Sequence, residues 1–504
     1  MATDLGTDLR LASGPGRGLV AAAVLGSGMA MLDGTVVNVA LPTIGRDLDA
    51  GLAALQWTVN AYTLTLASLI LLGGSLGDRL GRRRVFVVGV VWFALASLVC
   101  ALAPGAVWLV AARAVQGVGA ALMTPGSLAM IQASIHPADR GRAIGAWSGL
   151  GGLAAVFGPF LGGWLIAVNW RWVFAINIPL AAVTVALALR FAPDTRDPEA
   201  TGPLDLAGAV LGAVALGGAT FALMRAPDGV SPVVIAAAGV AGAGGLGFVV
   251  RERSAPAPMV PLSLFSDRTF TVVNLLTLAA YAALSGLLFF LVLQLQVSLG
   301  YTPLQAGLAT LPSMALLILF SSRMGALGQR IGPRLPLTVG PLLAAVGVLW
   351  LSRLQPGDGY LAGVLPGVLL FGAGLTTMVA PLTTTVMAAV PQHEVGVASG
   401  VNNAVARSAG LLAVAALPAV AGLSGQGYQD PALLTPAYTT ALTISAGLLA
   451  VGALICAVGL PRPAPAEVVQ PVPGAEPVGA PVRAVALPLR VNPCPAPCQP
   501  PAMG

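Results

Sequence analysis

Long apolar stretches, separated by short segments rich in arginine, glycine and proline, follow one another along almost the whole chain. A helix needs roughly 20 mostly apolar residues to cross a bilayer, and only helices and closed barrels satisfy their backbone there. The stretches are too long and continuous for the alternating strands of a barrel. The pattern predicts fourteen membrane helices, near residues 19–41, 53–76, 85–103, 106–130, 143–166, 171–191, 205–225, 231–250, 270–298, 304–327, 335–353, 360–389, 396–422 and 437–460.

Composition leads to the same fold class, an all-α polytopic membrane protein. Of 504 residues, 57% are hydrophobic and 9% are charged, whereas soluble domains carry about 25% charged residues. The four cysteines, two of them in apolar stretches and two near the C-terminus, suggest no disulfide framework. Because the chain shows no metal-ligand cluster and no nucleophile–base constellation, we expect neither an enzyme nor a bound cofactor or metal.

The arginines predict the orientation in the membrane. Most of those between the predicted helices fall in alternate connections, namely at 79–84, 140–142, 190–196, 251–268 and 330–334. Arginine is enriched in cytoplasmic loops, so both termini should be cytoplasmic. Residues 1–18 then form a cytoplasmic N-terminal segment, and residues 461–504, rich in proline and alanine, form a disordered cytoplasmic tail. The formal charge of +6 therefore indicates orientation and gives no reason to expect nucleic-acid binding.

The chain also repeats itself. GSLGDRLGRRR at 74–84 aligns with GALGQRIGPRL at 325–335, an offset of 251 residues. We therefore predict two parallel six-helix bundles, 19–191 and 270–460, with two inserted helices at 205–250. Such a repeat places the substrate cavity between the bundles near the midplane, with access alternating as one bundle rocks against the other.

Ionisable residues inside the predicted helices are few, and two of them lie at similar depth. Asp33 lies in the first helix and Arg113 in the fourth. A charged residue in a span costs roughly 2.5–3.5 kcal/mol on insertion scales, so each calls for an explanation. Burial disfavours an ionised carboxylate and a nearby cation favours it, so a movement that separates the two would change proton affinity. The alternative is a structural pair that only tethers two helices.

Two glycine-rich segments are candidates for conformational roles. The 74–84 loop brings together Gly77, Asp78, Arg79, Gly81, Arg82 and Arg83, in which the acid could pair with arginines as a latch that differs between conformations. The alternative is an ordinary positively charged loop. In the fifth predicted helix, Gly158, Pro159, Gly162 and Gly163 suggest a hinge or a seal, since small residues allow close packing and proline bends a helix.

Together these segments resemble the major facilitator superfamily, and specifically its fourteen-helix drug:proton antiporters. LDGTVVNVALPTI at 32–44 is similar to that family's first-helix motif, which implies proton coupling at Asp33. GDRLGRRR at 77–84 resembles its loop motif and implies a latch at Asp78. RAVQGVGAALMTPGS at 113–127 implies proton transfer by Arg113, and GPFLGG at 158–163 resembles the antiporter motif of exporters.

The resulting hypothesis is outward transport of amphipathic drugs or antibiotics in exchange for protons, by a monomer in the bilayer of a bacterial cell membrane. Because no acidic residue lies in the predicted helices after residue 270, monovalent cations, zwitterions or neutral molecules fit better than dications. Proton-coupled uptake or facilitated transport of a metabolite is the alternative, and a channel is a more distant one. Candidates for the cavity wall are Asn38, Trp57, Asn60, Tyr62, Asn274, Tyr281, Gln294 and Asn403.

Overall fold

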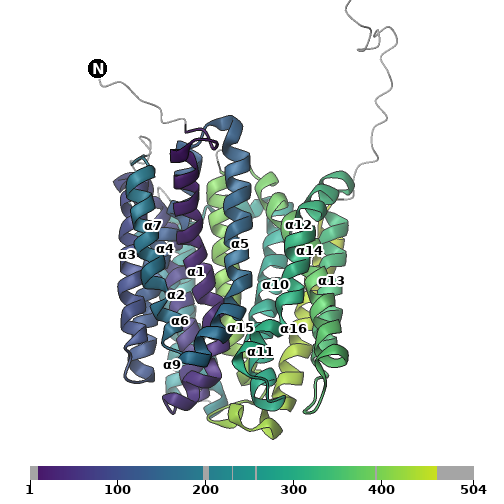
Figure 1. Cartoon of the computed structure of the whole chain (residues 1–504). Coiled ribbons are helices and arrows are strands. Elements are labelled where there is room, and N and C mark those ends of the chain that lie inside the picture. The colour runs from purple at the N-terminus through teal and green to yellow at the C-terminus, as the bar shows by residue number, and fades with distance from the viewer. Residues whose placement is uncertain (1–8, 197–203, 230, 256–257, 392–393, 462–504) are drawn as a thin grey trace, which may run out of the picture. The chain divides into compact units, whose positions relative to one another are not determined.

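The computed structural model describes residues 9–196, 204–229, 231–255, 258–391 and 394–461, and in these residues the regular structure is helical (Figure 1). The helices are α1 (Gly14–Asp47), α2 (Leu52–Leu80), α3 (Arg82–Ala101), α4 (Ala106–Ser134), α5 (Pro137–Val168), α6 (Trp172–Ala175), α7 (Asn177–Phe191), α8 (Leu206–Arg225), α9 (Pro232–Ser254), α10 (Arg268–Leu293), α11 (Pro303–Ala309), α12 (Leu311–Ile331), α13 (Arg334–Leu351), α14 (Leu365–Ala388), α15 (Val395–Val420) and α16 (Pro431–Gly459). Shorter turns are η1 (Ala226–Asp228), η2 (Leu262–Ser266), η3 (Gln294–Ser298), η4 (Tyr360–Val364) and η5 (Gly427–Gln429).

The membrane-protein fold class is confirmed. Thirteen helices in the described part of the chain are long and apolar enough to cross a bilayer. The fifth predicted span corresponds to α5, a helix of 32 residues in which Phe157–Val168 is apolar enough but short by the same criterion. The count of fourteen therefore stays a prediction at α5. The predicted C-terminal tail lies outside the described residues.

Several helices continue beyond the apolar stretches that predicted them. The helix expected at 19–41 runs from Gly14 to Asp47, since Ser13 caps its start by accepting a hydrogen bond from the Gly16 amide (3.1 Å). The segment 74–84, predicted as a loop, is mostly helix: α2 ends at Leu80 and α3 begins at Arg82. The chain turns at Gly81 alone, with φ of +113°, a conformation that other residues rarely adopt.

The helices form two groups, and within each group two helices approach closely through the same kind of glycine contact. In the N-terminal group, α1–α7, a Cβ built on Gly89 of α3 would lie 3.0 Å from the Gly119 carbonyl of α4. In the C-terminal group, α10–α16, a Cβ on Gly340 of α13 would lie 3.0 Å from the Gly374 carbonyl of α14. This correspondence is in keeping with the predicted repeat. Helices α8 and α9 pack on each other, and α8 also contacts α2 and α15, one helix from each group.

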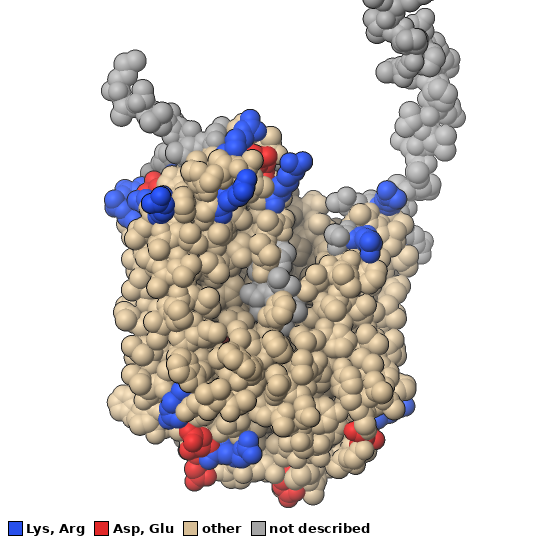
Figure 2. Space-filling model, in the orientation of Figure 1, with Lys and Arg blue, Asp and Glu red and all other residues tan. Residues whose placement is uncertain are grey.

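The two ends of the bundle differ in charge. Figure 2 shows arginines gathered at the upper end and charges of both signs at the lower end. The upper or arginine-rich end carries the α2–α3 turn, where the Arg84 side chain lies 2.8 Å from Asp194, beyond the end of α7. The lower or far end carries the last residue of α1, Asp47, which accepts hydrogen bonds from Trp170 (2.7 Å) and Arg171 (3.0 Å).

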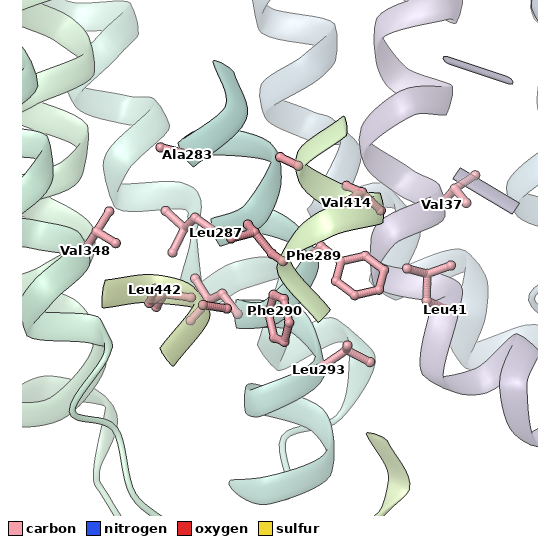
Figure 3. Packing of buried hydrophobic residues seen from close by; sticks show 14 of the residues in the cluster. Val37, Leu41, Ala283, Leu287, Phe289, Phe290, Leu293, Val348, Val414 and Leu442 are labelled. Carbon is pink, nitrogen blue, oxygen red and sulfur yellow. The ribbon is translucent and has the colours of Figure 1, made fainter. Parts of the chain in front are cut away.

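At the far end, hydrogen bonds and apolar packing join the two groups. The Leu52 amide donates to the Gly425 carbonyl (2.9 Å), and the Tyr428 hydroxyl donates to the Ala50 carbonyl (2.8 Å). Burial raises the pKa of Tyr428, so this hydroxyl remains a donor at neutral pH. Figure 3 shows Phe289 of α10 directed toward Val37 and Leu41 of α1, in one cluster of buried residues that spans both groups. The structure is therefore closed at the far end.

Candidate functional site

The two ionisable residues predicted at similar depth form a buried ion pair. The Asp33 side chain on α1 and the Arg113 side chain on α4 expose 0% and 1% of their surface. Arg113 Nη1 donates a hydrogen bond directly to Asp33 Oδ2. The similar depth predicted for the two residues is thus accompanied by direct contact between their side chains. Because removing one partner of such a pair leaves the other charge buried and uncompensated, each charge depends on the other.

Amide and hydroxyl groups from α4 itself and from two further helices, α3 and α7, complete the site. Gln116 Nε2 donates to Asp33 Oδ1 (2.9 Å) and to Ser97 Oγ (2.8 Å), and its Oε1 accepts from Arg113 (2.7 Å). Asn177 of α7 donates to the same Asp33 oxygen (3.2 Å). Both carboxylate oxygens of Asp33 therefore accept hydrogen bonds from the protein.

Aromatic rings enclose the arginine. The Arg113 guanidinium lies 4.3 Å from the centre of the Tyr62 ring and 5.7 Å from that of Phe174, and its Nε donates to the Thr58 carbonyl (2.9 Å). The Tyr62 hydroxyl donates to the Ala30 carbonyl on α1 (3.2 Å). The pair thus connects α1, α2, α4 and α7. Protonation of Asp33 would remove the negative charge of the ion pair and weaken the links between these helices.

The predicted latch residues lie where α2 passes into α3. Asp78, in the last turn of α2, accepts from Arg82 across the Gly81 turn (2.8 Å). Arg83 donates to the Ala192 carbonyl (3.1 Å), and the Arg82 amide donates to the Thr195 carbonyl (2.9 Å). The described contacts of this turn thus attach it to the segment after α7. Gly77 is buried in α2, and Arg79 Nε is buried without a hydrogen-bond partner in the described residues.

The glycines of α5 pack against both groups. A Cβ on Gly158 would lie 2.0 Å from Thr35 Oγ1, and one on Gly162 would lie 3.0 Å from Val36, both on α1. A Cβ on Gly163 would lie 2.6 Å from the Leu304 Cα of α11. On the same face, a Cβ on Gly307 of α11 would lie 2.2 Å from the Pro159 carbonyl oxygen. We call this contact between α5 and α11 the α5–α11 seam.

The candidate cavity residues separate into different environments. Asn38 lines a small pocket above the seam, beside Thr35 and Pro159 of the N-terminal group and opposite Leu288 and Met314. Asn60 is fully buried, and neither of its amide atoms has a hydrogen-bond partner in the described residues. Trp57 is half-buried on α2.

In the C-terminal group, two of these candidates have their amides engaged in packing. Asn274 accepts from Asn402 of α15 (3.1 Å). Gln294 is fully buried in η3 and donates to Thr435 Oγ1 (3.2 Å) and the Leu354 carbonyl (3.3 Å), which ties α10 to its neighbours near the far end. Tyr281 on α10 and Asn403 on α15 are exposed, the tyrosine by 36% of its surface.

Comparison with known proteins identifies the fold family. The family profile described as Major Facilitator Superfamily matches residues 23–415, most of the chain. The chain belongs to the Major Facilitator Superfamily. Members of this superfamily are transporters, and the chain is accordingly a multi-pass membrane protein. Among solved structures, it is similar to a transporter of the POT family in complex with a thioalcohol-conjugated peptide, with a TM-score of 0.65 and 14% identity over 87% of this chain and 95% of that chain. At this identity the likeness concerns the fold alone.

Several relatives within the superfamily are named for drug resistance. The puromycin resistance protein pur8 of Streptomyces alboniger is 37% identical, over 82% of this chain and 84% of its own length. The multidrug resistance protein Stp of Mycobacterium tuberculosis is 36% identical, over 75% and 71%. The tetracenomycin C resistance and export protein of Streptomyces glaucescens is 34% identical, over 79% and 74%.

Sequence reasoning missed three residues of this Major Facilitator Superfamily chain. Gln116 lies three residues after Arg113 on α4, a spacing that places both on one helix face, so the sequence did contain a signal. Asn177 begins α7, and its role depends on packing alone. Arg407 lies in the middle of α15, within the predicted span 396–422. The insertion cost of roughly 2.5–3.5 kcal/mol that drew attention to Asp33 applies to Arg407 as well.

Proposed function

We propose that this transporter exports amphipathic drug or antibiotic molecules across the cell membrane in exchange for protons, by alternating access. One observation carries the proposal: the Asp33 carboxylate is held away from water, opposite Arg113, at the junction of α1, α2, α4 and α7. The printed names of the relatives, which include antibiotic resistance and export proteins, support the choice of substrate class.

The neighbourhood of Asp33 suggests how proton binding would reach the seam. Thr35 and Val36 follow Asp33 within one turn of α1, and they are the residues against which Gly158 and Gly162 of α5 pack. The seam on the same stretch of α5 contacts α11. A shift of α1 after protonation of Asp33 would therefore move α5 relative to the C-terminal group. Small shifts at one site become discrete rearrangements because packed interfaces are not continuously deformable.

Orientation follows from the charge asymmetry. We assign the arginine-rich end to the cytoplasm, because arginine favours cytoplasmic loops, so the seam lies on the outer side. Both chain ends are then cytoplasmic, in a bacterial cell membrane. The bundles 19–191 and 270–460 move against each other, and the helices of 205–250 cover α2 and α15. In this arrangement the Asp78–Arg82 pair acts as a cytoplasmic latch, and the transporter works as a monomer.

Transport into everted membrane vesicles tests this function directly. Vesicles with wild-type protein should accumulate puromycin or ethidium when the lumen is acidified, and a protonophore should abolish the accumulation. Asp33→Asn should abolish it as well, because the amide cannot exchange a proton. Since asparagine keeps the shape of the side chain and Arg113 keeps its bonds to Thr58 and Gln116, the variant should still fold.

Asp47→Asn is the matched control, because Asp47 lies on the same helix but its side chain is 49% exposed at the far end. This variant should accumulate both compounds as the wild type does. Unimpaired gradient-driven accumulation by Asp33→Asn would refute the proton-coupling mechanism. Accumulation only in right-side-out vesicles would instead indicate uptake.

A further inference from the structure

Arg407 is a half-buried cation within a membrane helix, and the described part of the chain offers it no counter-ion. It lies near the midpoint of α15 and is half-buried, yet it makes no hydrogen bond or ion pair with any residue that the structure describes. Arg113, in the N-terminal group, has partners for both Nε and Nη1. An arginine inside a membrane protein normally pairs with an acid or a carbonyl, or it marks a substrate or ion pathway.

Contacts on either side place Arg407 between the two groups. Toward α2, Gln56 donates to the Val414 carbonyl (2.8 Å), and a Cβ on Gly400 would lie 2.7 Å from Leu71. Toward α10, a Cβ on Gly410 would lie 2.5 Å from Ser285 Oγ. Arg407 falls between these contact levels along α15. On α10, Tyr281 lies between Asn274, which accepts from Asn402, and Ser285, which meets Gly410, so it lies near the level of Arg407.

The helices packed against α15 supply no acid at this depth. Helices α8, α10, α14 and α16 contain no aspartate or glutamate. Helix α2 carries only Asp78, in its last turn and paired with Arg82. Asp33, on α1, already accepts from Arg113, Gln116 and Asn177. The positive charge of Arg407 is therefore left for a group that the described residues do not provide.

The surroundings of Arg407 are accessible. Tyr281 exposes 36% of its surface although it lies within the span of α10, and Asn403, one helical turn before Arg407, is exposed as well. A guanidinium can bind a carboxylate, sulfonate or phenolate oxygen with two parallel hydrogen bonds, and a tyrosine hydroxyl and an amide nearby can donate further ones.

We propose that Arg407 binds the negatively charged group of the transported molecule, so that the substrates include amphipathic anions and zwitterions. This inference rests on the proposed export function and narrows its substrate class. The sequence favoured monovalent cations, zwitterions or neutral molecules, and the inference adds anions to these classes. An apolar substrate body would occupy the space between the groups, and the Arg407 guanidinium would fix its orientation.

A pair of probes with one aromatic skeleton tests the inference. Anilinonaphthalenesulfonate carries a sulfonate, and anilinonaphthalene lacks it. Binding of each is measured by equilibrium dialysis to the full chain in lipid nanodiscs, with empty nanodiscs subtracted. The wild type should bind the sulfonate more tightly. Arg407→Gln should weaken sulfonate binding by about tenfold or more, since a charge-assisted pair is lost, and change binding of the neutral probe less than about twofold. Arg407→Lys should retain most of the sulfonate affinity.

Arg323→Gln is the matched control, because Arg323 is an exposed arginine of the same group whose described contact is with the Phe320 ring. It should leave binding of both probes unchanged. Equal loss of both probes in Arg407→Gln, or unchanged sulfonate binding, would overturn the proposal. If Arg407→Gln does not fold, the wild type alone decides, since a preference for the neutral probe contradicts an anion site. Binding without a gradient does not require proton coupling, so this result is independent of the Asp33→Asn experiment.

Discussion

The α5–α11 seam offers a perturbation whose effect can be worked out from geometry. In Gly307→Ala the added methyl group would lie 2.2 Å from the Pro159 carbonyl oxygen and 2.7 Å from its carbon. Both are backbone atoms within a helix, so no side chain can rotate away. Because ordinary contact begins near 3.4 Å, the two helices must separate by roughly 1 Å for the seam to stay closed. The substitution therefore penalises the closed far end.

The size of this penalty sets the expected shift in population. Inserting a methyl group into a packed interface costs about 1–3 kcal/mol. If the penalty applies only to the state in which the far end is closed, the ratio of open to closed molecules should rise about 5- to 150-fold. A ligand-free transporter that is mostly closed at this end should then show a clearly measurable open population.

Distances between spin labels at the far end measure the shift. Val107, at the start of α4, and Leu361, in η4, are exposed by 81% and 76% and belong to different groups. They can be changed to cysteine and labelled after Cys494 and Cys498 are replaced by serine, since Cys100 and Cys456 are buried. Gly307→Ala should add a longer distance to the distribution, and Gly163→Ala, which meets the Leu304 backbone, should do the same.

Gly447→Ala is the control, because a Cβ at this position on α16 has no neighbour within 4 Å. It should reproduce the wild-type distances. If Gly307→Ala also gives the wild-type distribution while folding normally, the seam does not restrain opening, and the reasoning from close contact is wrong.

Two further predictions concern stability, measured by thermal unfolding of the purified protein in detergent. Gly81→Ala should cost about 1–3 kcal/mol, because it forces a side chain into a conformation with φ of +113° and places its Cβ 2.5 Å from Asp194 Oδ1. Its control, Gly105→Ala, lies in extended backbone with open space and should leave stability unchanged. An equal effect of both substitutions would contradict the argument from the turn at Gly81. Gln116→Leu should cost about 1–3 kcal/mol, because Asp33 and Arg113 each lose a buried hydrogen bond. Gln355→Leu, in an exposed loop, should leave the unfolding temperature unchanged, and a wild-type value for Gln116→Leu would show that its hydrogen bonds contribute nothing to stability.

The sequence was most informative where the governing energy is local to a segment. The cost of placing a polar group in lipid depends on the segment itself. The membrane helices, and the charged residues Asp33 and Arg113 within them, could therefore be predicted from the apolar stretches. The ends of the helices were less predictable, since capping groups such as Ser13 extend a helix beyond its apolar stretch. The turn at 74–84 was misread as a loop because charged and glycine residues also occur in the last turns of helices.

Partners, in contrast, depend on how each helix is rotated and which helix it meets, and tertiary packing decided them. Gln294 resembled a cavity residue in the sequence but its amide serves contacts with Leu354 and Thr435. The close approach of Gly307 to Pro159 joins segments about 150 residues apart, and no local pattern specifies it. By itself the sequence placed Asp33 and Arg113 within membrane helices, and it also places Arg407 in one, although that residue was not singled out. Only the folded structure decided which of these charges is neutralised within the protein, because the attraction between two charges depends on the distance between them in the folded chain and not on their separation in the sequence.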